Sequence, residues 1–205
     1  MNLWYEKAMT SNSQDPDKNR SEPDGFDPFT HRLSRDVRNT LSTALSQSLA
    51  SETSEIFETA AAEWLDRLSH DACRRYVEER LRRYRQAFKA VCRLPSDRLL
   101  PQIAILWNLE LYFEVHEVAE EAFHAASGSD REFLQGLILA AGVFVQQDAG
   151  RHGAAGSVSK RAYEILKQHG SRLSFMKNPK VFLDGLLQDP PQPVQIIVEG
   201  SNLDD

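Results

Sequence analysis

The sequence predicts an all-α protein: a multi-helical antiparallel bundle with one central buried helix and an N-terminal helical extension. Three observations support this fold class. Apolar residues recur three and four positions apart in successive segments, which is the spacing of one face of a helix. The segment 133–147 is apolar at almost every position, as expected of a helix buried on all sides. Glycine and proline residues separate the segments and mark where helices end.

Composition divides the 205 residues into four regions. Residues 1–30 are rich in Ser, Asn, Asp and Pro, which predicts a disordered tail. Residues 31–95 predict the helical extension and residues 96–188 the helical domain, with the boundary at Pro95 because proline disfavours helix geometry at the residue before it. Residues 189–205 predict an extended tail whose prolines argue against a buried strand.

The N-terminal extension contains three amphipathic segments. Residues 32–49 and 54–68 each place apolar residues on one helical face. We expect these helices to wrap around the central helix or to form a homo-oligomer. Residues 71–93 carry a seam that alternates three and four positions apart, the spacing of helix-on-helix packing, made of Cys73, Val77, Leu81, Tyr84, Phe88 and Val91.

The third segment is also dense in arginine. A basic helix can bind phosphate backbones, so nucleic-acid binding through Arg74–Arg93 is one alternative function. The other interpretation is a solvated face whose cations balance the glutamates Glu114, Glu117 and Glu121. The formal net charge of −6 argues against dedicated nucleic-acid binding, and we favour the second interpretation.

Two consecutive helices are expected at the centre of the domain. In a helix over 110–124, His116 falls at the edge of the apolar stripe and Glu120 lies directly above it, whereas Glu114 points further round towards solvent. After a Ser/Gly break, Ser129 is followed three residues later by a glutamate, the pattern of a reciprocal capping box. The buried helix 133–147 comes next.

These two helices resemble a known family. The segments LWNLELYFEVHEVAEEAF and DREFLQGLI, followed by a glycine-containing turn and GAAGSVSKRAYEIL, are similar to the small all-helical family catalogued as domain of unknown function 309. Its hallmark is a Tyr/Phe-x-Glu-x-His-Glu-x-x-Glu helix followed by a Phe-Leu-Gln-Gly-Leu helix. The resemblance covers about residues 99–188 and implies no established activity. The family usually has Gly at Glu110, Trp at Phe123 and often His near Gln146.

The resemblance implies that the family's polar signature falls on Glu114, His116, Glu117, Glu120 and Gln135, and the helix spacing independently predicts a polar pocket here. A buried amide at Gln135 needs hydrogen-bond partners, and His116 and Glu120 are the expected suppliers. The predicted geometry therefore brings an imidazole, an acid and a carboxamide together at the edge of a dry core. The candidate ligand-pocket residues are Tyr112, Glu114, His116, Glu117, Glu120 and Gln135.

Three roles for this cluster stay open. His116 can be a structural hydrogen-bond clip between two close-packed helices. It can instead be a metal ligand together with Glu120, because imidazole and carboxylate oxygens bind divalent ions. In a catalytic site His116 would shuttle protons while Glu120 orients it, with Glu117 beside them. Candidates for a further metal ligand from another helix are Gln135, Glu63 and His152.

The leading functional hypothesis is a non-catalytic helical binding or interaction module whose polar pocket takes a small molecule or a peptide. The enzymatic alternative is a metal-assisted hydrolase centred on His116, Glu117 and Glu120, with a divalent metal as its cofactor. The sequence contains no glycine-rich phosphate loop and no serine-elbow nucleophile motif. Whether the protein is an enzyme is left open by the sequence alone.

The sequence favours a cytoplasmic protein. Cys73 and Cys92 lie on one predicted helix, about 30 Å apart at the helical rise per residue, so they cannot bridge each other within it. This fits reduced thiols. The N-terminus lacks the basic and apolar pattern of a signal peptide, and no segment is long and apolar enough to cross a membrane.

Overall fold

The computed structural model describes residues 25–95 and 98–198. Within these residues the chain is all-helical, with one isolated antiparallel bridge between Met176 and Val198 and no β-sheet. The predicted all-α fold is confirmed. No helix in the described part of the chain has the length and apolar character of a membrane span. The predicted tails lie outside the described residues over 1–24 and 199–205.

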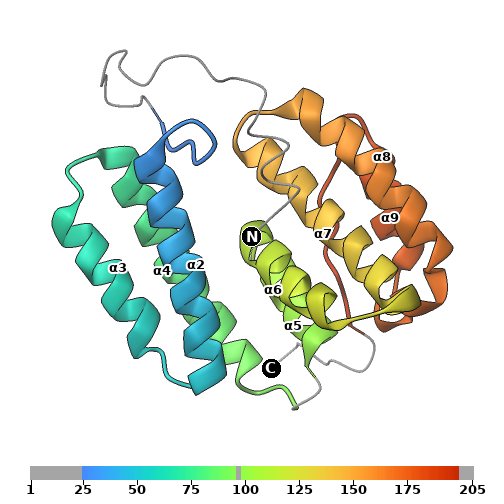
Figure 1. The fold of residues 1–205 in the computed structure, drawn as a ribbon, viewed down its shortest axis with the longest axis horizontal. Helices are drawn as coiled ribbons and strands as arrows, with labels where there is room; N and C mark the ends of the chain where they lie inside the picture. Colours follow the sequence, from blue (N-terminus) through green and yellow to red (C-terminus); the bar gives the residue numbers. More distant parts are fainter. Residues whose placement is uncertain (1–24, 96–97, 199–205) are drawn as a thin grey trace.

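Three helices form the N-terminal group in Figure 1: α2 (Arg32–Ser51), α3 (Glu55–Arg67) and α4 (Asp71–Val91). Each packs against the other two, because the apolar faces predicted from their spacing meet in a shared core. For example, Phe57 of α3 packs edge-to-face on Tyr84 of α4, with ring centroids 5.9 Å apart.

The buried face of α4 differs from the predicted seam at two positions. Arg80 and Ala87 are buried, whereas the predicted Leu81 and Phe88 are half-buried. The face is rotated because α4 contacts α5 as well as α2 and α3, and Arg80 turns inward to a carboxylate. The other four seam residues are buried within this chain, and a homo-oligomer through these helices stays a prediction.

The second group follows the chain from α5 to α9. In it α7 packs against α6 on one side and α8 on the other, which makes α7 the central helix (Figure 1). Gly136 of α7 permits this close packing, because a Cβ there would lie 2.7 Å from the Leu166 side chain. The elements are α5 (Leu99–Asn108), α6 (Tyr112–Ala125), α7 (Gly128–Asp148), α8 (His152–Gln168), the 3-10 helix η1 (Gly170–Phe175) and α9 (Pro179–Leu187).

Two local predictions about the central helices were wrong. The capping box at Ser129 does not form: Ser127 precedes α7, and the Ser129 hydroxyl lies in the first turn, where it accepts a hydrogen bond from Arg172 at 3.0 Å. The helix predicted over 110–124 begins at Tyr112 instead. Glu110 has a left-handed backbone with φ of 55°, which separates α5 from α6 and explains why a glycine suits this position in the resembling family.

Segments outside the helices also pack onto the bundle. Phe26, within the region predicted as a tail, stacks on Tyr76 with ring centroids 3.6 Å apart. At the other end, residues 188–198 form no helix and bury the Ile196 side chain. Both segments therefore contribute side chains to the packed interior.

Candidate functional site

Glu114 connects the two groups of helices through buried hydrogen bonds. Its Oε1 accepts from the Tyr84 hydroxyl at 2.6 Å, and its Oε2 accepts from Arg80 Nη1 at 3.2 Å. The Glu114 residue is only 2% exposed. Burial, and next the charge of Glu114, raises the pKa of Tyr84 well above its ordinary value of 10.0. We call these three residues the Arg80–Glu114–Tyr84 tie. The expectation that Glu114 points to solvent was wrong, because its carboxylate is buried and bonded to α4.

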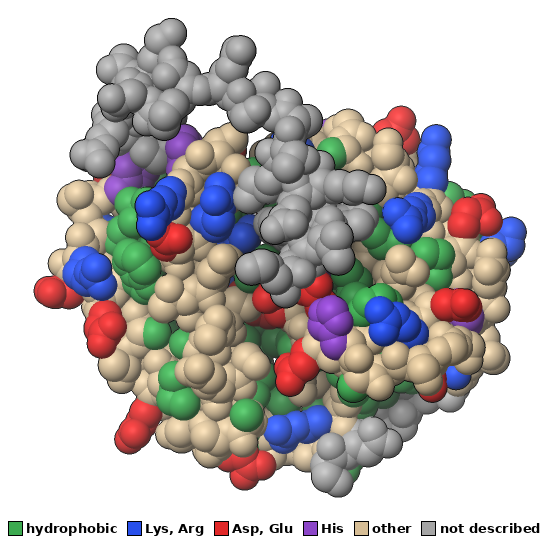
Figure 2. All heavy atoms as spheres, in the orientation of Figure 1, with side chains coloured by type: hydrophobic (Ala, Val, Ile, Leu, Met, Phe, Trp, Pro, Cys, Tyr) green, Lys and Arg blue, Asp and Glu red, His purple; other side chains and the backbone are tan. Residues whose placement is uncertain are grey.

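A cavity of about 400 Å³ lies between α2 and α6. We call it the α2/α6 cavity, and Figure 2 shows acidic side chains and a histidine on the α6 side of the hollow between these helices. Its floor is apolar, with Leu45, Leu49, Leu106 and Val118. The wall from α6 includes Glu117, Glu120, Glu121 and His124, and the wall from α2 includes Ser42, Thr43, Ser46 and Gln47.

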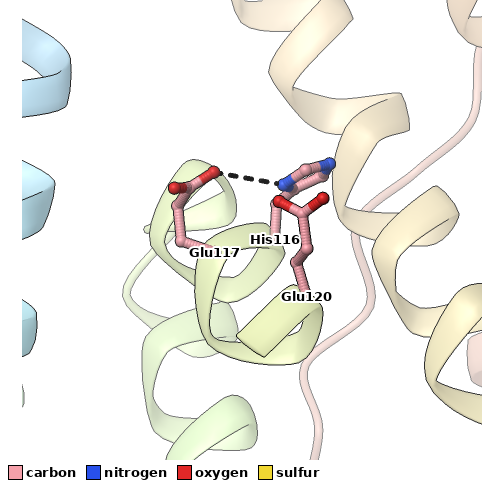
Figure 3. A group of neighbouring side chains, drawn as sticks. All are labelled: His116, Glu117 and Glu120. Carbon is pink, nitrogen blue, oxygen red and sulfur yellow. Dashed lines mark ion pairs between the residues drawn. The ribbon is translucent and has the colours of Figure 1, made fainter. Parts of the chain in front are cut away.

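His116, Glu117 and Glu120 come together at the edge of this cavity, and we call them the His116 group. One ligand atom from each lies within 4.8 Å of the other two. His116 Nδ1 is 3.4 Å from Glu117 Oε1, and Figure 3 shows the carboxylates of Glu117 and Glu120 flanking the imidazole. The imidazole is buried, with 5% of the residue exposed, whereas Glu117 and Glu120 reach the cavity. The group can therefore present one nitrogen and two carboxylates to a shared ligand.

Other candidate pocket residues lie elsewhere. Tyr112 belongs to an aromatic core cluster, with ring centroids 5.2 Å from Trp107 and 5.0 Å from Phe144. Gln135 is half-buried on α7 and, among the described residues, is not part of the His116 group or of the cavity wall. Its contact with His116 stays a prediction. Of the suggested extra ligands, Glu63 on α3 and His152 on α8 are both exposed.

His124 extends the polar row of α6, one turn beyond the His116 group. Its Nε2 lies 3.9 Å from Glu120 Oε1, and its side chain is exposed. His124 also lines the α2/α6 cavity, so its imidazole lies beside the Glu120 carboxylate there.

Five of the six arginines of α4 bond to groups inside the chain. Arg83 Nη2 binds Glu110 at 2.9 Å, and Arg85 binds Glu58 at 2.6 Å. Hydrogen bonds from Arg82 and then Arg83 lower the pKa of Glu79 to about 2. These contacts fit the interpretation of α4 as a face whose cations balance nearby carboxylates, although most of the partners differ from those expected.

Comparison with known protein families gives one match. Residues 100–158 match the model of a family described as domain of unknown function, DUF309. We call this matching stretch the DUF309 segment. The resemblance seen in the sequence is thereby confirmed over these residues, and its extension to residue 188 stays a prediction. No curated protein and no solved structure matches the chain.

The DUF309 segment supplies only one wall of the α2/α6 cavity. It contains the whole His116 group on α6, while α2, which carries Ser42 and Gln47 of the opposite wall, lies before it in the chain. Sequence reasoning missed this second wall because the spacing of residues along α2 does not say which helix its polar face lies beside. The available signal was the set of uncharged polar residues Ser42, Thr43, Ser46 and Gln47, which share one face of α2 where a solvated helix usually carries charges.

Proposed function

We propose that this protein is a helical binding module whose His116 group holds a divalent metal cation at the edge of the α2/α6 cavity. The observation that carries the proposal is the convergence of three ligand atoms within 4.8 Å. An imidazole nitrogen with two carboxylate oxygens is a donor set suited to Zn²⁺, Mn²⁺ or Fe²⁺.

The electrostatics of the His116 group favour a cation. The ligand oxygens of Glu117 and Glu120 approach each other within 4.8 Å beside a buried ring, and like charges this close disfavour one another. A shared cation offsets that repulsion.

The cavity gives the bound ion access to a further ligand. Three protein ligands leave at least one coordination position of a four-coordinate ion for water or a small molecule. Glu117 and Glu120 line the α2/α6 cavity, so that position can face it. The leucine floor would contact the apolar part of such a molecule, and Ser42 and Gln47 offer hydrogen-bonding groups from the other side.

Metal-assisted hydrolysis is the second candidate, and the same opening favours it. A cavity of about 400 Å³ beside the proposed ligands is large enough to admit a small substrate next to an ion-bound water. A divalent ion lowers the pKa of that water and makes it a nucleophile near neutral pH. In that case every substitution that removes the ion would also remove hydrolysis.

The test is isothermal titration calorimetry of chelator-treated protein with Zn²⁺ and Mn²⁺. We expect one equivalent to bind the unmodified protein, and Glu120→Gln to weaken binding by at least about 100-fold, because losing a direct ligand costs no less than losing its supporting partner. Glu121→Gln is the matched control, since Glu121 lines the cavity outside the His116 group. Its affinity should stay within about twofold of the unmodified protein. The absence of saturable binding, or equal losses in both variants, would contradict the proposal.

A further inference from the structure

Residues 189–198, which we call the C-terminal strap, are recognised by helix side chains along their main chain. Asn108 Nδ2 donates to the Ile196 carbonyl and Asn108 Oδ1 accepts from the Ile196 N–H, both at 2.8 Å. This pair of bonds imitates the exchange between hydrogen-bonded residues of an antiparallel sheet. Next to it, Trp107 Nε1 donates to the Val194 carbonyl at 2.8 Å.

Contacts further along the strap follow the same principle. Gln147 Nε2 donates to the Pro191 carbonyl at 2.9 Å, and the Gln192 N–H donates to the Gly185 carbonyl at 2.9 Å. Near the end, Lys177 N–H donates to the Ile197 carbonyl at 2.8 Å. Hydrogen bonds to the main chain provide affinity without requiring one sequence, as when a peptide adds to a sheet edge.

Two strap side chains act as anchors. Ile196 is 1% exposed and Pro191 is buried, whereas Ile197 between the main-chain contacts is 43% exposed. The groove also has a position that only glycine fits: a Cβ on Gly185 would lie 2.7 Å from Val194 Cγ2 and 2.8 Å from the Gln192 carbonyl oxygen. The groove therefore binds the main chain of the strap, lets it pass close to the helix at Gly185, and buries apolar side chains as anchors.

We propose that this groove, formed by Trp107, Asn108, Gln147 and Gly185, is a peptide-binding site that the strap occupies in cis. It also accepts, in trans, an extended segment with a proline followed by aliphatic residues three and five positions later. The strap is a suitable occupant because its prolines restrict it to extended conformations, which lowers the entropy lost on binding. The groove is separate from the His116 group, and the inference does not depend on metal binding.

Exchange of the strap tests this inference. A protease site introduced after Gln188, an exposed residue between α9 and the strap, allows the full chain to fold before it is cut. A fluorescent peptide with the sequence of residues 189–198 is then added in excess, and its anisotropy is followed. We expect the peptide to enter the groove with saturable binding, and unlabelled peptide to displace it.

Three variants, one of them a control, make the test specific. Asn108→Leu removes both bonds to Ile196 and should weaken peptide binding by about tenfold or more. Gly185→Ala should abolish it, whereas Gly153→Ala, where a Cβ would meet nothing within 4 Å, should leave it unchanged. The inference is overturned if the cut strap never exchanges, if cutting unfolds the helices by circular dichroism, or if all variants bind the peptide equally.

Discussion

Glu114 and Glu120 stand six residues apart on α6, yet their surroundings differ. Glu114 is held by Tyr84 and Arg80 from another helix and is 2% exposed. Glu120 lies at the cavity edge within 4.8 Å of His116 and Glu117. The comparison teaches that a shared motif does not imply a shared role: its two partners on α4 make Glu114 structural, and the approach of His116 and Glu117 makes Glu120 a candidate ligand.

The largest expected effect is a difference in unfolding free energy between variants of Glu114 and of Glu120. Glu114→Ala leaves the Arg80 charge and the Tyr84 hydroxyl buried without their acceptor, which should cost about 3–5 kcal/mol of unfolding free energy. Glu120→Gln should change stability by only about 0.5 kcal/mol or less, because its side chain reaches solvent. Urea unfolding followed by circular dichroism measures both. Similar losses in the two variants would break the comparison.

Substitution of Tyr84 should cause a smaller loss of unfolding free energy, and this loss should depend on pH. At pH 7 Tyr84→Phe removes a hydrogen bond to a buried carboxylate, which should cost about 1.5–3 kcal/mol. The pKa of Tyr84 is raised in the folded protein, so the contribution of the neutral hydroxyl is complete below pH 10 and is lost as the pH rises towards the folded pKa. The stability difference between unmodified protein and variant should therefore narrow above about pH 10.

Urea unfolding of the two proteins in parallel at pH 7, 9 and 11 measures this narrowing. The other titrating groups are common to both proteins and cancel in the difference. A gap that stays constant to pH 11 would show that the Tyr84 hydroxyl ionises equally in the folded and unfolded chains, contrary to its burial against Glu114.

The smallest loss of unfolding free energy is expected when a solvent-exposed ion pair is removed. Arg85 and Glu58 are bonded at 2.6 Å, but their side chains are 58% and 34% exposed. Glu58→Gln should therefore cost about 0.2–1 kcal/mol, and less at high salt. A loss in urea unfolding as large as that of Glu114→Ala would mean that burial does not decide what these arginine–glutamate pairs contribute.

Helix periodicity predicted most of the fold because it reports which face of each helix is apolar. The buried stripe with Val115 and Ala119, and His116 at its edge, follow from the spacing of α6 alone. The turn at Glu110 did not follow, because a left-handed residue is a backbone property that glutamate rarely adopts. The break between α5 and α6 was missed for that reason.

The candidate site was predicted only in part, because two of its features are tertiary. The burial of Glu114 depends on Arg80 and Tyr84, which precede it by 34 and 30 residues. The cavity wall with Ser42 requires α2 to lie beside α6. Spacing along one helix brings His116 and Glu120 together, but it carries no information about what a neighbouring helix places opposite them.

The most direct test of the account is an anomalous diffraction map of crystals grown with Zn²⁺. The account predicts a peak bonded to His116 and to the carboxylates of Glu117 and Glu120, at the edge of the α2/α6 cavity. It predicts no peak at Glu114, whose oxygens are bonded to Tyr84 and Arg80. A map without a peak at the His116 group, or with zinc at Glu114 instead, would contradict the division of roles along α6.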